Sequence, residues 1–234
     1  MAIVNASKTL RVLSHLLDYP STTVRTHLPE LKQALHEERA IGAARLSELV
    51  ALMQWIIESA PLDVEADYVS LFDRGRSTSL HLFEHIHGDS RDRGPAMIDL
   101  AQTYEKAGLY LAEGELPDFL PALLEFVSTQ PPREARAFLS EMTQILNALF
   151  TALKQRQSPY ASVLGALIEL AGETAQSVAL APEVPLDEAW SEPVAFDGCS
   201  TQGQARPGQS QPIHMIQNQN RRANSNQASQ GAVA

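Results

Sequence analysis

Apolar side chains recur at helical intervals through almost the whole body of the chain. Leu10, Leu13 and Leu17 are spaced by three and four positions, and comparable spacing continues as far as Leu170. Such spacing places apolar side chains on one stripe of an α-helix, whereas a half-buried strand alternates apolar and polar residues. No segment shows convincing strand alternation. The sequence therefore predicts an all-α fold, a single-domain helical bundle in which each helix buries one face.

Prolines, glycines and capping residues mark where the predicted helices begin and end. Ser90 is predicted to cap a helix that runs from about Arg91 to Ala112, because its hydroxyl can accept from free backbone N–H groups. Pro131-Pro132 is predicted to begin one long helix that reaches Leu153. The remaining predicted helices cover residues 10–19, 46–57, 64–72, 117–127 and 158–170.

The charge of the chain is divided unevenly. Residues 1–197 carry all 28 acidic residues and 15 of the 18 basic ones, a net charge of −13, and residues 198–234 carry only three arginines, a net charge of +3. An acidic body repels nucleic acid and anionic lipid, so we expect basic or apolar partners instead. Gln, Asn, Ser, Gly and Pro dominate the tail, and too little of it is apolar to offset the entropy of ordering. We expect one helical domain over residues 1–190 and a disordered tail over 191–234.

Cysteine content and the N-terminus indicate the compartment. The lone cysteine, Cys199, cannot form an internal disulfide or hold a metal cluster by itself. The stretch from Met1 to Lys8 lacks a signal-peptide pattern, and no apolar run approaches the ~20 residues that span a bilayer. We expect a cytoplasmic protein with no iron–sulfur cluster held by its own cysteines, no nucleic acid partner and no direct insertion into a membrane.

The most distinctive segment, residues 71–94, contains an H-x-x-E-H motif. On a helix, His81 and His85 would lie one turn apart beside the Glu84 carboxylate, as in some zinc peptidases. Catalytic zinc also needs a third protein ligand on a separate element, and no downstream ligand segment is recognisable. A zinc metallohydrolase that uses His81, Glu84 and His85 is therefore the alternative hypothesis, and capping or packing by the two histidines is the favoured one.

Two other kinds of catalytic site are excluded by residue type. The stretch Asp73–Ser79 lacks the glycine-rich cradle and the lysine of a phosphate-binding loop. Cys199 lies among residues expected to be disordered, with no base to activate a thiolate. We expect no catalytic residue and no metal ligand. Instead, arginine forks are expected to hold neighbouring carboxylates and to fix the angle between helices. The arginines of this structural charge network are Arg74, Arg76, Arg91 and Arg93.

Three stretches carry a resemblance to a known family. They are Leu71-Phe72-Asp73-Arg74-Gly75-Arg76, Phe83-Glu84-His85-Ile86-His87-Gly88-Asp89 and Glu115-Leu116-Pro117-Asp118. With the Leu16-Leu17-Asp18-Tyr19-Pro20 ending of the first helix, they resemble the NarJ-type assembly chaperones of respiratory nitrate reductase, in the TorD-like family of redox-enzyme maturation proteins. The resemblance extends to about residue 170. Phe119 departs from it, since this family often has His at that position.

The resemblance implies a helical chaperone without a cofactor, rather than an enzyme. Its client would be the apo catalytic (alpha) subunit of nitrate reductase, including the N-terminal segment, bound before molybdenum cofactor and iron–sulfur insertion and before membrane docking. Proteins that deliver the molybdenum cofactor are further candidate partners. An acidic helical body suits a basic amphipathic client, because helix-in-groove recognition joins apolar anchors to charge complementarity at the rim.

We expect the client-binding site to lie within and beside the distinctive segment. Its expected apolar contacts are Leu71, Phe72, Leu80, Phe83, Pro117 and Phe119. The carboxylates expected at this site are Asp73, Glu84, Asp89, Asp92, Glu115 and Asp118. Those that pair with Arg74, Arg91 or Arg93 are expected to orient neighbouring segments, and only the unpaired ones to meet basic client residues. His85 is expected at the same site, where its protonation would alter the polarity of the groove.

Overall fold

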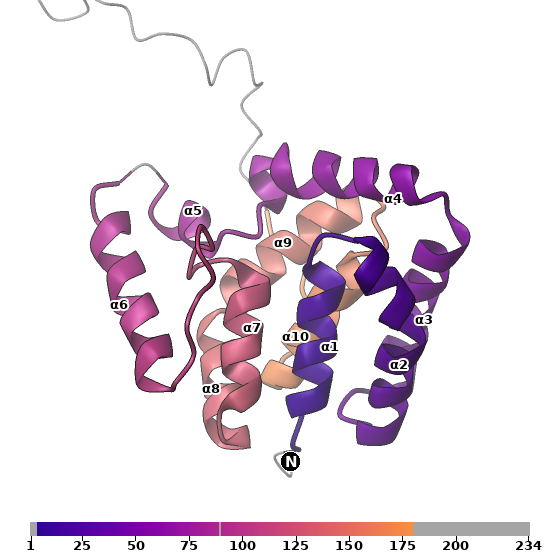
Figure 1. Ribbon diagram of the computed structural model, residues 1–234, viewed down its shortest axis with the longest axis horizontal. Coiled ribbons are helices and arrows are strands. Elements are labelled where there is room, and N and C mark those ends of the chain that lie inside the picture. Colours follow the sequence, from indigo (N-terminus) through magenta and orange to yellow (C-terminus); the bar gives the residue numbers. More distant parts are fainter. Residues whose placement is uncertain (1–3, 89, 180–234) are drawn as a thin grey trace, which may run out of the picture. The chain divides into compact units, whose positions relative to one another are not determined.

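The structure, a computed structural model, describes residues 4–88 and 90–179. These residues form helices joined by loops, and no strand occurs among them (Figure 1). The predicted all-α fold is confirmed. The predicted boundary near residue 190 and the predicted disorder of residues 191–234 lie outside the described residues. Within the described ranges, no helix combines the length and the apolar character that a bilayer crossing requires.

The α-helices of the described part are named in chain order. They are α1 (Ser7–Leu17), α2 (Thr22–Glu38), α3 (Ala43–Glu58), α4 (Pro61–Tyr68), α5 (Leu82–Ile86), α6 (Arg93–Lys106), α7 (Leu120–Thr129), α8 (Pro132–Glu141), α9 (Thr143–Gln155) and α10 (Ala161–Ala171). Two short turns separate α4 from α5. They are one turn of π-helix, η1 (Val69–Asp73), and one turn of 3-10 helix, η2 (Arg76–Thr78).

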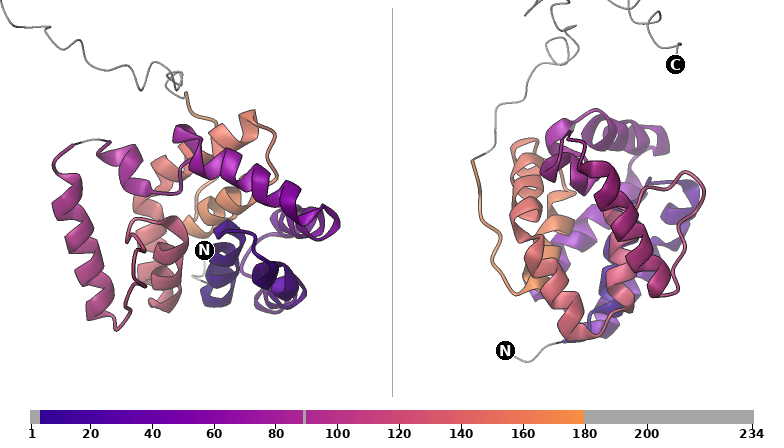
Figure 2. Two further views of the ribbon diagram at one scale, coloured as in Figure 1. Left: turned by 45° about the horizontal axis from the view of Figure 1, so that its top comes forward. Right: turned by 90° about the vertical axis from the view of Figure 1, so that its left-hand side faces the viewer.

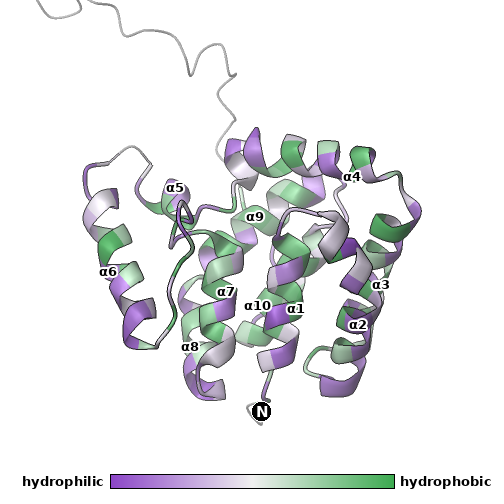
Figure 3. Cartoon of the chain, viewed as in Figure 1, coloured by the Kyte–Doolittle hydropathy of each residue, from purple (hydrophilic) through white to green (hydrophobic). Residues whose placement is uncertain are grey.

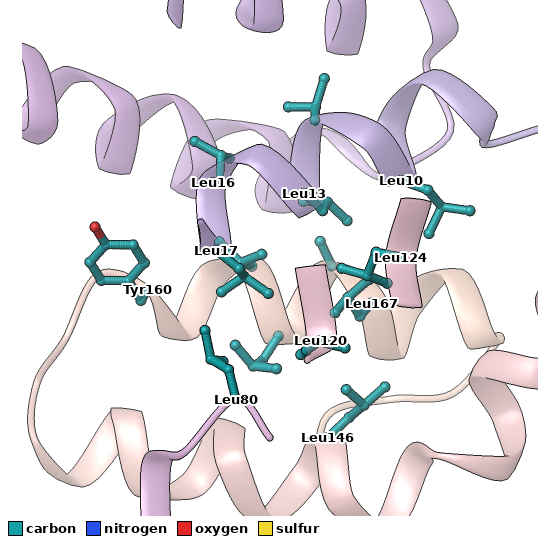
Figure 4. Close-up of a cluster of buried hydrophobic side chains, with 14 of the residues drawn as sticks. Leu10, Leu13, Leu16, Leu17, Leu80, Leu120, Leu124, Leu146, Tyr160 and Leu167 are labelled. Atoms are coloured by element: carbon teal, nitrogen blue, oxygen red, sulfur yellow. The ribbon is translucent and has the colours of Figure 1, made fainter. Parts of the chain in front are cut away.

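The core forms around α10 and the contact between α1 and α7. Helix α10 packs against α1, α3, α8 and α9, and all of its residues except Glu169 and Leu170 are buried, as expected for a helix at the centre of a core. Leu13 of α1, Leu124 of α7 and Leu167 of α10 meet in one cluster (Figure 4). The outer helices carry their apolar residues on the inward side and polar residues outside (Figure 3). The helical spacing of apolar residues thus fixes which faces are buried.

Helix α6 is shorter than predicted and is not capped by Ser90. It ends at Lys106, and Gly108 follows with φ +80°, a conformation that stops the helix. The Ser90 hydroxyl accepts from the Asp92 N–H (3.2 Å) in a turn before the helix. Asp92 occupies the cap position, without a capping side-chain hydrogen bond. The prediction of a helix over 91–112 capped by Ser90 was therefore wrong at both ends.

The predicted long helix from Pro131 to Leu153 consists of two helices, α8 and α9. The chain turns at Met142, whose N–H donates to the carbonyl of Leu139 (3.2 Å). Leu139 of α8 and Leu146 of α9 are both buried in the core that surrounds α10. The turn lets two short helices contact one central helix, and neither proline nor glycine marks it in the sequence. The predicted single helix was wrong for this reason.

Helix α2 was not predicted. It begins after Ser21, whose hydroxyl accepts from the Val24 N–H (3.4 Å), and it carries Pro29 in its interior. Only Leu28 and Leu35 are buried, so the apolar stripe is thin. Its last residue, Glu38, accepts from the N–H groups of Lys8 (3.0 Å) and Thr9 (2.5 Å). A distant carboxylate thereby satisfies free donors at the start of α1.

Candidate functional site

Two segments of the expected site, far apart in sequence, lie side by side. The Leu82 N–H donates to the carbonyl of Asp118 (3.0 Å), and the Leu120 N–H donates to the carbonyl of Leu80 (2.9 Å). These bonds form an isolated antiparallel bridge between His81 and Phe119. The bridge fixes the start of α5 against the start of α7. The structure therefore brings together the two stretches that the sequence analysis placed at one site.

The side chain of Asp118 is the centre of this arrangement. It is fully buried, and its Oδ2 accepts from the Phe83 N–H (3.1 Å) while Nδ1 of His81 lies 3.2 Å from Oδ1. Nη2 of Arg93 lies 3.7 Å from Asp118 Oδ2 and 3.8 Å from Oε1 of Glu84. We call His81, Phe83, Glu84, Arg93 and Asp118 the Asp118 cluster. It connects the starts of α5, α6 and α7.

Asp118 was expected among the carboxylates that meet the client. Both of its oxygens are instead directed to groups of the same chain, and none of its surface is exposed. A buried carboxylate needs such partners, because an unpaired buried charge is costly. In this conformation Asp118 orients the neighbouring segments and is not available at the surface.

Several expected apolar contacts are also buried. Phe72 packs with ring centroids 4.8 Å from Tyr68 and 5.2 Å from Tyr160, inside the core. Gly75 allows the chain to pass close to Leu71 and Thr78, because a Cβ at this position would collide with the Leu71 carbonyl and with the Thr78 side chain. The buried members of the expected apolar set are Leu71, Phe72, Leu80 and Pro117. They can reach a client only if this part of the chain moves, so their role stays a prediction.

Two aromatic residues of the expected set are half-buried and present part of their surface. Phe83 lies edge-on to His87 with ring centroids 5.3 Å apart, and Phe119 lies 5.3 Å from the His81 ring. Both adjoin the Asp118 cluster. Phe119 is the position that departs from the resemblance, and here it covers the imidazole that Asp118 holds. These two rings are the expected apolar contacts that a client could reach without a movement of the chain.

The remaining expected carboxylates and arginines lie mostly at the surface. Asp73, Asp92 and Glu115 are exposed, and Glu115 Oε2 accepts from the Ala112 N–H (3.1 Å). Asp89 lies outside the described residues. Arg93 pairs with Glu84 and Asp118, whereas the other arginines of the expected network are exposed. Those exposed arginines are Arg74, Arg76 and Arg91.

The geometry does not support the zinc alternative. His81 precedes α5, so it and His85 do not face one another across a helical turn. Its Nδ1 points to Asp118, and Nε2 of His85 lies 2.8 Å from the Ser79 carbonyl. Among the described residues, no group of three or more His, Cys, Asp or Glu is placed to hold a metal ion. Each imidazole is used to hold the loop before α5 in place.

Tyr104, near the end of α6, contacts the segment that carries Asp118, although it was not among the residues predicted for the site. Its hydroxyl donates to the Pro117 carbonyl (2.8 Å), and its ring lies 4.9 Å from that of Phe126. Burial raises the pKa of Tyr104, so the hydroxyl stays protonated and remains a donor. The available signal was a tyrosine eleven positions after Arg93, on the same helical stripe.

The protonation of His81 is expected to affect stability. The hydrogen bond to Asp118 raises the pKa of His81 and outweighs the partial burial that lowers it. A group whose pKa is raised on folding stabilises the protein fully below its unfolded pKa, here the ordinary 6.5, and the effect is lost as pH rises through the folded pKa. Urea unfolding at about pH 6 and about pH 8.5 should show a larger loss for the natural chain than for His81→Gln.

His27→Gln is the matched control for this measurement, since His27 is exposed on α2. It should lose as much stability with pH as the natural chain does. Equal pH dependence in His81→Gln and His27→Gln would show that the ion pair with Asp118 contributes nothing to stability.

Comparison with known proteins extends over most of the described chain. The family model described as "Nitrate reductase delta subunit" matches residues 18–165. The chain is 39% identical over 188 residues to the "Nitrate reductase molybdenum cofactor assembly chaperone NarJ" of Escherichia coli K12, and the match covers 80% of each. It is also 39% identical over 180 residues to the "Probable nitrate reductase molybdenum cofactor assembly chaperone NarW" of the same organism, covering 76% of this chain and 74% of that protein.

A solved structure shares the fold. The crystal structure of a redox enzyme maturation protein from Archaeoglobus fulgidus matches with a TM-score of 0.53 and 19% identity. The match covers 71% of this chain and 94% of that one. At this identity the likeness concerns the helical architecture alone.

Proposed function

Since this chain belongs to the nitrate reductase delta subunit family, we propose that it is an assembly chaperone for a respiratory nitrate reductase. One observation carries the proposal: 39% identity, over 80% of both chains, to a protein named as a chaperone of molybdenum cofactor assembly in nitrate reductase. Such a protein acts by binding and needs no catalytic residue. His81 and His85, the histidines of the alternative hydrolase, make hydrogen bonds within the chain instead.

The client in this proposal is the apo catalytic (alpha) subunit, including its N-terminal segment. Binding in the cytoplasm precedes insertion of the molybdenum cofactor and the iron–sulfur cluster, and it delays docking at the membrane. Proteins that deliver the molybdenum cofactor are further partners in the proposal. The acidic body of the chain, with a net charge of −13 over residues 1–197, supports a basic client segment.

The surface proposed for the client adjoins the Asp118 cluster. The half-buried rings of Phe83 and Phe119 supply apolar contact area. The exposed carboxylates of Asp73, Asp92 and Glu115, on the segments that the sequence motifs single out, supply negative charge. Apolar anchors surrounded by charged groups are the arrangement that recognises an amphipathic helix.

The proposal is tested by capture of the client. The tagged full-length chain is purified from cells that produce the catalytic subunit but cannot make the molybdenum cofactor. The captured polypeptide should be the catalytic subunit without its cofactor, and it should be displaced by a synthetic peptide of its N-terminal segment. Failure to capture that subunit, together with no calorimetric signal for the peptide at low salt, would reject the proposal.

The exposed carboxylates give a graded prediction. Asp73→Asn and Glu115→Gln should each weaken peptide binding about two- to fivefold at low ionic strength, because a rim charge adds a modest, screened attraction. In about 1 M salt the difference should disappear, since the screening length there is about 3 Å. Glu30→Gln, an exposed change on α2, should leave the affinity unaltered. Losses that persist in high salt would assign these side chains to local structure instead.

A further inference from the structure

Helix α6 is held less firmly than the other long helices. Helices α1 and α7 pack along one another, as do α9 and α10, but within the described residues α6 has no extended packing against any helix. It lies at the left edge of the bundle in Figure 1 and in the left view of Figure 2. Ile98 on its outer side is 59% exposed. Segments with few buried apolar contacts are the ones that open locally.

The contacts that α6 does make come from one stripe. Arg93 in its first turn reaches Asp118 and Glu84. Leu100 packs on the core, and Tyr104 contacts Phe126 and the Pro117 carbonyl. The positions 93, 100 and 104 share one helical face, and the first and last are eleven positions apart, or about 16 Å.

The face of the body beneath this stripe has three parts. At one end, the carboxylates of Asp118 and Glu84 lie near a single arginine. At the other end, the Phe126 ring and the Pro117 carbonyl accept an aromatic residue with a hydroxyl. Between them is an apolar surface that takes Leu100. When Arg93 leaves with α6, His81 can neutralise at most one of the two carboxylates, so a negative charge remains there and favours a positively charged ligand.

We propose that this face is a docking surface for a basic amphipathic helix of the client. In the absence of the client, α6 occupies the surface, and the client helix displaces it on binding. The matching helix carries Arg or Lys at its first position, an apolar residue seven positions later and an aromatic residue eleven positions later. The identity of the occupant rests on the proposed chaperone function, whereas the surface and its displacement are testable without the client. A client helix takes the place of α6, and α6 swings away while both of its flanking segments stay attached.

A labelled synthetic peptide with the α6 sequence, residues 92–107, is the client-independent probe. Arg93→Met in the full-length chain loosens its own α6, and the matched control Arg91→Met changes an exposed arginine two residues away. Apparent affinity scales with the fraction of chains whose site is open, so the peptide should bind Arg93→Met about tenfold more tightly than Arg91→Met. The same peptide with Arg93→Glu should bind at least about tenfold more weakly, because a carboxylate would face Asp118 and Glu84.

Hydrogen exchange keeps the test decisive if Arg93→Met fails to fold. Tyr104→Phe removes only the hydroxyl that donates to the Pro117 carbonyl, and it should raise exchange across α6 several-fold while α10 stays protected. The docking surface would be overturned if the α6 peptide bound Arg93→Met and Arg91→Met with equal affinity. It would also be overturned if hydrogen exchange in Tyr104→Phe rose in α6 only as much as in α10.

The client arm of the experiment separates the two proposals. Addition of the catalytic subunit's N-terminal peptide should deprotect the amides of α6 and protect those of residues 117–123. A peptide that binds and leaves α6 protected would overturn the docking surface and leave the chaperone function standing. A chain that binds the α6 probe as expected but does not bind the client peptide would overturn the proposed chaperone function and leave the docking surface standing.

Discussion

Replacement of Asp118 by alanine is expected to cost about 2–3 kcal/mol in the free energy of unfolding. The change leaves the Phe83 N–H without its acceptor and removes the counter-charge of His81 and Arg93. A partly buried donor that loses its partner costs about 1–3 kcal/mol, and the two partly exposed cations recover hydration, so they add little. Urea denaturation, with the midpoint and the slope determined together, measures the loss.

Two further variants show whether the effect belongs to the carboxylate. Asp118→Asn retains an acceptor for the Phe83 N–H and should cost only about 1 kcal/mol. Asp99→Ala removes an exposed carboxylate from α6 and should stay within about 0.5 kcal/mol of the natural chain. If Asp118→Ala were as mild as Asp99→Ala, the carboxylate would not anchor these segments.

The fold class followed from the sequence because burial in this chain follows helical stripes. The first predicted helix, 10–19, overlaps α1, and the predicted helix over 158–170 overlaps α10. In both, strongly apolar stripes face the core, so periodicity alone suffices.

The misplaced helix boundaries have a common cause in tertiary structure. The break at Met142 serves the contact of α8 and α9 with α10, and no local residue announces it. The α1 terminus receives its acceptor from Glu38, on another helix. Ser90 had the right residue type for a cap, but the chain turns once more before α6 begins. Local signals cannot reveal partners that folding brings from elsewhere.

The sequence motifs predicted which segments lie together, but not which groups their side chains contact. Leu80 and Asp118 were expected at one site, and a backbone bridge does join their segments. Whether a carboxylate faces a client or its own chain depends on which donors lie within about 4 Å after folding, and spacing along the sequence does not give that. Tyr104 was missed for the same reason, since its partners, Pro117 and Phe126, are both outside α6.

The largest loss of stability is expected for Leu167→Ala, at about 3–4 kcal/mol. Leu167 is fully buried in α10, beside Leu13 and Leu124 (Figure 4), so truncation removes apolar contacts and leaves a cavity that helices on all sides hold open. Leu62→Ala is the matched control, because Leu62 on α4 is 77% exposed, and it should change stability by no more than about 0.5 kcal/mol.

Client binding distinguishes this core effect from an effect at the site. At a temperature where the folded state still predominates, Leu167→Ala should bind the client peptide with unchanged affinity, because α10 carries no residue of the Asp118 cluster and only the population of folded chains falls. Asp118→Ala should alter that affinity at a somewhat smaller cost in stability, since it loosens α6 and removes one carboxylate of the proposed docking surface. If affinity fell in proportion to stability in both variants, client binding would depend only on the folded state as a whole. The proposed docking surface at the Asp118 cluster would then be rejected.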